Sequence, residues 1–291
     1  MPAGGGQMVD VTRIAVIGSG TMGRGIAQSA AAAGYDVALH DVSAELMERA
    51  RAGIAADLDR AVAKGKGTLD EKDATLSRIG LEPSLEGAAG SADLVLEAVP
   101  EILDLKRSLF ARLDAAAAEH AVLATNTSSL PVGRIAEAAA RPERVVGMHF
   151  FNPVPLMPLL EVVRAARTGD GAVETAVEVG RRMGKEPIVV RDSPGFATSR
   201  LGVLLGLEAM RMLEEGVASA EDIDRAMTLG YRHPMGPLRL TDLVGLDVRL
   251  AIAEHLHREL RSEAFRPPEI LRRMVSEGRL GKKSGRGFYT W

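Results

Sequence analysis

Short apolar runs alternate with longer helical stretches over the first two-thirds of the chain. The apolar runs are rich in β-branched residues and are flanked by glycine and polar residues, which predicts buried strands. We expect these strands at residues 13–18, 36–41, 93–99, 121–128, 144–150, 159–163 and 186–192. A helical pattern fills residues 21–33 and stops at Gly34. Regular alternation of this kind predicts a mostly parallel sheet that is covered by helices on both faces.

The pattern changes at two places. A charged, alanine-rich region at residues 44–77 predicts two helices that are separated near Gly65 and Gly67. Beyond Asp192 the strands stop, and helical stretches follow at residues 200–215, 220–229, 241–261 and 268–277. We therefore expect a doubly wound α/β domain at residues 11–192 and an all-helical domain at residues 193–291. The glycine-rich residues 1–10 predict a disordered tail rather than a signal peptide.

Composition excludes several kinds of chemistry. The 291 residues are 46% hydrophobic, which allows a sizeable core, and a net charge of −3 carries no basic signature of nucleic-acid binding. The absence of cysteine excludes disulfides, thiolate metal sites and cysteine nucleophiles, and it suits a cytoplasmic protein. No apolar run reaches the roughly 18 residues of a membrane helix. The histidines are scattered without ligand spacing, so we expect no metal site.

A glycine-rich turn, GSGTMG, follows the first predicted strand and opens the first predicted helix. Gly18 permits a tight turn, Gly20 lets the backbone approach a pyrophosphate, and Gly23 lets the helix pack closely on the sheet. Thr21 and Met22 lie at the helix N-terminus, whose partial positive charge suits a diphosphate. This context predicts a Rossmann-type dinucleotide site. The alternative is an ordinary tight turn without a ligand.

The second predicted strand ends in Asp41. A carboxylate at this position accepts hydrogen bonds from the adenosine ribose and repels a 2′-phosphate. No arginine follows within the next few residues. The sequence therefore favours NAD over NADP.

Three further motifs follow along the chain: NTSSL at residues 126–130, HFFNPVP at 149–155 and DSPGFATSR at 192–200. Together with LGKKSGRGFY at residues 280–289, they resemble the L-3-hydroxyacyl-CoA dehydrogenases over nearly the whole chain. The resemblance implies an NAD-dependent enzyme of fatty-acid metabolism that interconverts 3-hydroxyacyl-CoA and 3-oxoacyl-CoA. It also implies a homodimer that pairs through the helical domains.

The reaction chemistry points to a histidine base. Oxidation of a secondary alcohol requires a group that removes the hydroxyl proton near neutral pH, and histidine suits this task. His149 and Glu161 lie on consecutive predicted strands, on either side of a proline-rich turn. A carboxylate on one ring nitrogen fixes the tautomer and stabilises the imidazolium. The family resemblance implies the same pair.

Other assignments depend on the resemblance. It implies that Ser128 hydrogen-bonds the substrate oxygen, although a serine at a strand end is otherwise an ordinary turn cap. Asn126 is expected near the nicotinamide and the substrate. Glu101 and Lys106 match positions that contact the nicotinamide ribose region. Lys283 matches a lysine that closes over the cofactor.

Substrate recognition includes two departures from the family. Lys64 matches a lysine near the CoA phosphates, but Asp57 replaces a serine that also meets CoA. Ser199 replaces an asparagine that contacts the substrate beside the histidine, and a serine there is shorter. Two alternatives stay open: a dehydrogenase of a small polyol acid such as L-gulonate, and a dinucleotide-binding protein of low activity.

Overall fold

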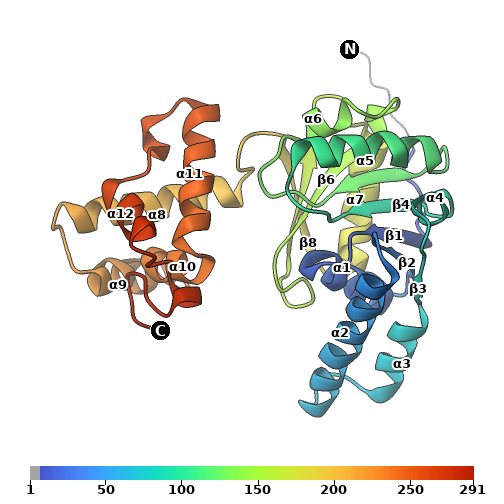
Figure 1. Ribbon diagram of the computed structural model, residues 1–291, viewed down its shortest axis with the longest axis horizontal. Coiled ribbons are helices and arrows are strands. Elements are labelled where there is room, and N and C mark those ends of the chain that lie inside the picture. Colours follow the sequence, from blue (N-terminus) through green and yellow to red (C-terminus); the bar gives the residue numbers. More distant parts are fainter. Residues whose placement is uncertain (1–6) are drawn as a thin grey trace. The chain divides into compact units, whose positions relative to one another are not determined.

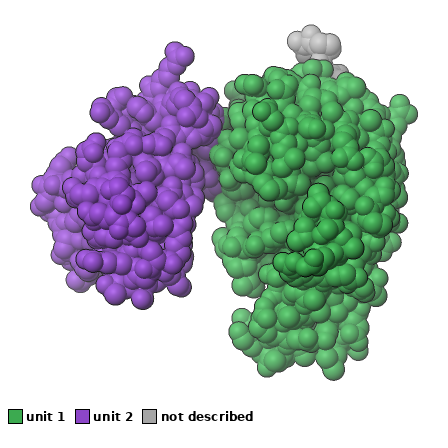
Figure 2. Space-filling model, in the orientation of Figure 1, with its two compact units in different colours: residues 1–193 green, residues 194–291 purple. Residues whose placement is uncertain are grey.

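The computed structural model describes residues 7–291, and the chain divides into two compact units (Figures 1 and 2). Unit 1 ends at Ser193 and unit 2 begins at Pro194. Of the tail expected at residues 1–10, residues 1–6 lie outside the described part of the chain. Residues 7–10 form no helix or strand, but the Val9 amide donates to Thr175 Oγ1 at 2.9 Å and Val9 packs against the core. This end of the expected tail is therefore anchored on unit 1.

Unit 1 is built around an eight-stranded sheet with the order β3-β2-β1-β4-β5-β6-β7-β8. All neighbouring strands pair in parallel except β6 and β7, which are antiparallel. The sheet confirms the predicted α/β class. Strand β3 was not predicted, because it has only three residues. The strands are β1 (Arg13–Ile17), β2 (Asp36–His40), β3 (Ile79–Leu81), β4 (Leu94–Glu97), β5 (Val122–Thr125), β6 (Val145–Phe150), β7 (Leu159–Arg164) and β8 (Glu186–Arg191).

Helices cover both faces of this sheet (Figure 1). One core cluster joins Ile14 and Val16 of β1 to Ile26 of α1 and Val173 of α7, so α1 and α7 share a face. Helices α4, α5 and α6 pack against the sheet from the other face. Their bounds are α1 (Thr21–Ala32), α4 (Leu85–Gly90), α5 (Leu103–Ala116), α6 (Val132–Ala136) and α7 (Asp170–Arg182), and the 3-10 turn η1 (Pro142–Arg144) precedes β6.

The charged region after β2 forms two helices, α2 (Ala44–Ala63) and α3 (Leu69–Ser77), as predicted. Ser43 begins α2 by accepting the Leu46 amide, and Thr68 begins α3 in a reciprocal capping box with Glu71. Between the helices, Gly65 has a φ of 67°, a left-handed conformation that ends a helix. Gly65 therefore ends α2, and the break between the two helices lies where the sequence predicts it.

Unit 2 is helical, as predicted, with α8 (Thr198–Glu214), α9 (Ala220–Gly230), α10 (Pro237–Val244), α11 (Leu246–Leu260), α12 (Glu269–Ser276) and the 3-10 turns η2 (Glu263–Phe265) and η3 (Lys282–Ser284). The prediction of a single helix at residues 241–261 was wrong. Gly245 has a φ of 105°, which a helix cannot contain, so α10 and α11 are separate. In residues 7–291, the structure has no helix that combines the length and the apolar character needed to span a membrane.

Asp93, just before β4, hydrogen-bonds the N-terminal end of β1. This contact allows a test of the fold. The Asp93 carboxylate accepts the Thr12 and Arg13 amides at 2.8 and 3.0 Å and lies 2.9 Å from His120 Nε2. Burial raises the pKa of the Asp93 carboxyl, but the hydrogen bonds outweigh burial and lower the pKa from 3.8 to about 2.

A carboxylate with a lowered pKa in the folded state stabilises the fold above its ordinary pKa, and this contribution is lost as the pH falls toward about 2. We expect D93N to lower the free energy of unfolding at pH 7 and to flatten its decline between about pH 4 and about pH 2. Urea unfolding over this pH range measures both effects. D36N, at an exposed aspartate, is the control. An unchanged D93N profile would contradict the assignment.

Candidate active site

Residues predicted for the site gather where parallel strands of unit 1 end. Gly18 follows β1, Asp41 follows β2, and Asn126 follows β5. Glu101 lies shortly after β4, and His149 lies near the end of β6. In open α/β sheets, ligands bind at this edge, where the strand order changes direction. The sheet order places that change between β1 and β4, so these residues lie where the fold binds ligands.

The glycine-rich turn has the conformation that its sequence predicts. Gly18 has a φ of 98°, and a Cβ on Gly23 would lie 1.7 Å from the Gly18 carbonyl oxygen. A Cβ on Gly20 would meet nothing within 4 Å, so the backbone is open to a ligand there. Thr21 and Met22 begin α1. A cavity of about 780 Å³ is lined by residues 18–22 of the turn and by Arg24, Asp41, Val42 and Arg49. The turn and the cavity fit a dinucleotide.

Asp41 is held in place by a residue that the sequence analysis did not single out. Its Oδ2 accepts the Ser19 amide at 2.6 Å and the Ser19 hydroxyl at 2.7 Å, and its Oδ1 accepts the Val42 amide at 2.7 Å. Partial burial raises the pKa of Asp41, but these hydrogen bonds hold the pKa below its ordinary value. Asp41 is therefore a fixed carboxylate at neutral pH.

His149 and Glu161 face each other across the antiparallel pair β6 and β7. The two residues are in register, and His149 Nδ1 lies 2.7 Å from Glu161 Oε2. The His149 side chain is 9% exposed and the Glu161 side chain is 0% exposed. The ring of Phe151 packs against the imidazole with centroids 4.4 Å apart. Burial shields this contact from water, which strengthens a hydrogen bond between the two side chains.

The turn between β6 and β7 is anchored by Lys185, which the sequence analysis missed. The Lys185 ammonium donates to the carbonyl of Val154 at 2.6 Å and to that of Met157 at 3.1 Å. Burial lowers the pKa of Lys185. Pro153, Pro155 and Pro158 restrict the backbone of this turn further. These constraints hold the strands that carry His149 and Glu161.

Glu101 organises the NTSSL segment. Its Oε1 accepts the Thr127 hydroxyl at 2.6 Å and the amides of Ser128 and Ser129 at 3.0 and 3.1 Å. The Ser128 hydroxyl lies 3.4 Å from the same oxygen. Burial raises the pKa of Glu101, but hydrogen bonds and the Lys106 ammonium hold it below its ordinary value. The structure therefore brings Glu101 and Ser128 into contact.

Asn126 joins this segment to the strand that carries His149, because its Oδ1 accepts the Phe150 amide at 3.0 Å. Lys106 is completely buried, and its ammonium lies 2.6 Å from Glu97 Oε1 and 3.5 Å from Glu101 Oε2. Its expected contact with the nicotinamide ribose stays a prediction. Glu97 itself was not predicted, although a glutamate inside an apolar strand run was a visible signal.

The residues expected at CoA lie on α2. Lys64 is exposed at the C-terminal end of the helix. Asp57 forms ion pairs with Arg60 and, at 3.5 Å, with Arg24 of α1. The two arginines offset the negative charge that Asp57 places at the position of the family serine. Any unfavourable effect of this acid on a phosphate is therefore smaller than its charge alone would suggest.

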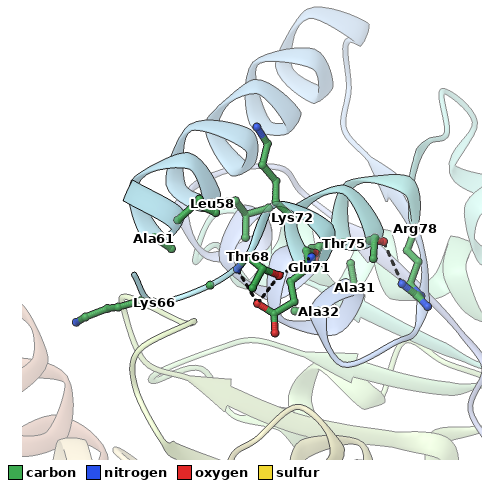
Figure 3. Close-up of a pocket in the computed structure, with 13 residues that line it drawn as sticks. Ala31, Ala32, Leu58, Ala61, Lys66, Thr68, Glu71, Lys72, Thr75 and Arg78 are labelled. Atoms are coloured by element: carbon green, nitrogen blue, oxygen red, sulfur yellow. Dashed lines mark hydrogen bonds between the residues drawn. The ribbon is translucent and has the colours of Figure 1, made fainter. Parts of the chain in front are cut away.

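A second cavity, of about 360 Å³, lies between α1, α2 and α3 (Figure 3). Glu71 at its edge is engaged by Thr68 in the capping box. Lys72 is paired with Asp59, and the Lys66 side chain points away from the cavity. Glu71, Lys72 and Arg78 are thus engaged by the fold, and the cavity adds no candidate chemistry.

Two predicted site residues belong to unit 2. Ser199 lies in the first turn of α8. The Lys283 ammonium donates to Asp247 Oδ2 at 2.6 Å, and this hydrogen bond lowers the pKa of Asp247. The expected contacts of Ser199 with substrate and of Lys283 with the cofactor stay predictions.

The fixed Asp41 carboxylate leads to a cofactor prediction. We expect D41A to weaken NADH binding by about tenfold to a hundredfold, because hydrogen bonds to a charged group contribute about 1.5–3 kcal/mol. NADPH binding should weaken less or improve, since the charge that repels its 2′-phosphate is removed. Fluorescence titration of both cofactors measures the ratio. An unchanged preference would place the ribose contact elsewhere.

Comparison with known proteins agrees with this geometry. The family model "3-hydroxyacyl-CoA dehydrogenase, NAD binding domain" matches residues 13–193, and the model of the family's C-terminal domain matches residues 195–291. A probable 3-hydroxybutyryl-CoA dehydrogenase of Bacillus subtilis is 44% identical, covering 97% of this chain and 98% of its own. The mitochondrial hydroxyacyl-coenzyme A dehydrogenase of Sus scrofa is 42% identical, with coverages of 99% and 94%. The crystal structure of (S)-3-hydroxybutyryl-CoA dehydrogenase from Ralstonia eutropha has a TM-score of 0.93 at 39% identity and covers 97% of this chain and 99% of that one. The chain therefore belongs to the 3-hydroxyacyl-CoA dehydrogenase family, whose NAD-dependent enzymes are oxidoreductases.

Proposed function

We propose that this enzyme interconverts (S)-3-hydroxyacyl-CoA and 3-oxoacyl-CoA, with short chains such as 3-hydroxybutyryl-CoA as substrates. The observation that carries the proposal is the 2.7 Å contact between His149 Nδ1 and Glu161 Oε2 at the ligand-binding edge of the sheet. The bacterial relatives are named 3-hydroxybutyryl-CoA dehydrogenases, and these names support a short acyl chain in the substrate. The cofactor is NAD, which the family's first domain binds.

The proposed reaction assigns His149 as the general base. NAD, held by the glycine-rich turn at Gly18 and by Asp41, would supply the acceptor for the hydride on C3 of the substrate. His149 Nε2 takes the proton of the 3-hydroxyl, and the C–O bond becomes a carbonyl. Glu161 holds the proton of Nδ1, which leaves Nε2 as the proton acceptor, and it stabilises the imidazolium that forms. In the reverse direction, the imidazolium returns the proton to the oxygen.

Ser128 and Ser199 are proposed to contact the substrate. The Ser128 hydroxyl donates to the substrate oxygen and stabilises negative charge on it in the transition state. Its position depends on Glu101, which binds the Ser128 amide at 3.0 Å. Ser199 occupies the position of the family asparagine and retains a hydroxyl for a polar contact. Asn126 and Glu101 are proposed to lie beside the nicotinamide ribose.

The CoA moiety needs cationic partners for its phosphates. We propose Lys64 as one of them, on the exposed end of α2. Arg24 and Arg60, which neutralise Asp57, keep the local charge positive. This arrangement favours an acyl-CoA over a small polyol acid, which has no phosphates to bind.

A homodimer is proposed to form through unit 2. Leu201 and Leu205 are one turn apart on α8 and are 61% and 44% exposed, whereas Leu207 on the same helix is buried in the core of the unit. Exposed leucines spaced by one helical turn suit pairing with a second copy. Analytical ultracentrifugation of the purified protein reports this state directly.

The test of the proposed function is NADH oxidation with acetoacetyl-CoA, followed by absorbance. We expect turnover with NADH and little with NADPH. H149A should lower kcat by about a hundredfold to ten-thousandfold, as for loss of a general base, and should leave NADH binding unchanged. Absence of turnover in the native protein despite NADH binding would overturn the proposal that short-chain acyl-CoA is the substrate. Near-native kcat in H149A would remove His149 from the mechanism.

A further inference from the structure

Glu97, the last residue of β4, is a buried carboxylate behind the candidate site. Its side chain is 0% exposed, and Thr125 Oγ1 donates to its Oε2 at 2.6 Å. The amide of Val99 donates to its Oε1 at 2.7 Å. Glu97 and Thr125 are in register on paired strands, and the Asn126 amide donates to the Glu97 carbonyl at 2.7 Å. Glu97 therefore contacts Thr125, the last residue of β5, through its side chain. It contacts Asn126, the first residue of the NTSSL segment, through its backbone carbonyl.

Lys106 connects this carboxylate to a second one. Its ammonium is 2.6 Å from Glu97 Oε1 and 3.5 Å from Glu101 Oε2, and it also reaches the Val99 carbonyl at 3.4 Å. Lys106 is on α5, whereas Glu97 ends β4 and Glu101 follows it. The Lys106 ammonium thus lies between the carboxylates of Glu97 and Glu101, both at the C-terminal end of β4.

Glu101 connects the Glu97–Lys106 ion pair to the NTSSL segment, which contains the proposed substrate contact Ser128. Its Oε1 is the shared acceptor of Thr127, Ser128 and Ser129. Its Oε2 faces Lys106 at 3.5 Å. A continuous chain of charge-assisted contacts therefore leads from Glu97 through Lys106 and Glu101 to Ser128.

A buried ion pair is a poor source of stability, because desolvation opposes the attraction, and apolar residues of similar volume often stabilise as well. What such a pair provides is a defined geometry for the groups that it touches. We propose that Glu97 and Lys106 are positioning residues, which fix Glu101 and through it the Ser128 hydroxyl. This inference rests on the proposed function in its assignment of Ser128.

The first variant removes the charge of Glu97 and keeps its shape. In E97Q, Lys106 retains only the Glu101 carboxylate as a charged partner. We therefore expect the ammonium to shift toward Glu101 and to weaken the hydrogen bonds of Glu101 with the NTSSL segment. Displacement of a positioned group by about 1 Å costs about a hundredfold in rate, so kcat with acetoacetyl-CoA should fall by about tenfold to a hundredfold. NADH binding should weaken by up to about tenfold, because Glu101 is expected beside the nicotinamide ribose.

D114N is the matched control. Asp114 is also a buried carboxylate, 5% exposed, and it lies 2.7 Å from Arg144 Nη2. It contacts no residue of the NTSSL segment among the contacts of residues 7–291. E97Q and D114N should both lower Tm, but only E97Q should change kcat and the Kd for NADH.

A charge-free double variant, E97L/K106M, separates positioning from stability. Apolar replacement of both partners should restore much of the Tm lost in E97Q. It should not restore kcat, because Glu101 then lacks its ammonium partner. A double variant with kcat within about threefold of the native enzyme would overturn the proposal. So would equal kinetic effects of E97Q and D114N.

The cofactor measurement keeps this test independent of the substrate. If the native protein binds NADH but does not turn over acetoacetyl-CoA, the proposed function fails while the Kd for NADH still reports on Glu101. In that case, weaker NADH binding in E97Q, which keeps Lys106, with D114N unchanged, supports the positioning role. An unchanged Kd in E97Q contradicts it.

Discussion

The reversal of direction between β6 and β7 places the central contact of this site. Every other strand pair in the sheet is parallel, and a parallel crossover would separate His149 from Glu161 by a helix. The antiparallel pair puts the two residues in register, and Lys185 holds the turn that joins the strands. The imidazole thereby obtains a buried carboxylate on Nδ1 from backbone pairing rather than from flexible loops.

Carboxylates recur at the ligand-binding edge of unit 1, and each one is held by donors. Asp41 is fixed by Ser19, Glu101 by the NTSSL segment, Glu97 by Lys106, and Glu161 lies against His149. A buried carboxylate without such partners would take up a proton and lose its directing charge. At Asp41 and Glu101 the hydrogen bonds outweigh burial and hold the pKa below its ordinary value, whereas at Glu97 burial dominates and raises the pKa.

Much of this was accessible from the sequence, for identifiable reasons. Strand periodicity predicted the sheet, glycine predicted the turn at Gly18 and the break near Gly65, and the end of the strand pattern at Asp192 predicted a helical second part. The long-range partners were not accessible, because Lys106 meets Glu97 and Lys185 meets Val154 only after the strands assemble. The break at Gly245 was missed because a single glycine inside a helical pattern does not reveal its φ. The roles of Ser128, Ser199 and Lys283 came from family resemblance, since an isolated serine or lysine has no distinguishing pattern.

The central claim is that Glu161 holds a proton on His149 Nδ1 and leaves Nε2 to act as the base. Nitrogen-15 NMR of the histidine-labelled protein at about pH 8 tests this directly, with the His149 signals assigned among the six histidines by their loss in H149A. The account predicts a neutral ring protonated at Nδ1 and unprotonated at Nε2, and a changed tautomer balance in E161Q. A neutral ring protonated at Nε2, unaffected by E161Q, would contradict it.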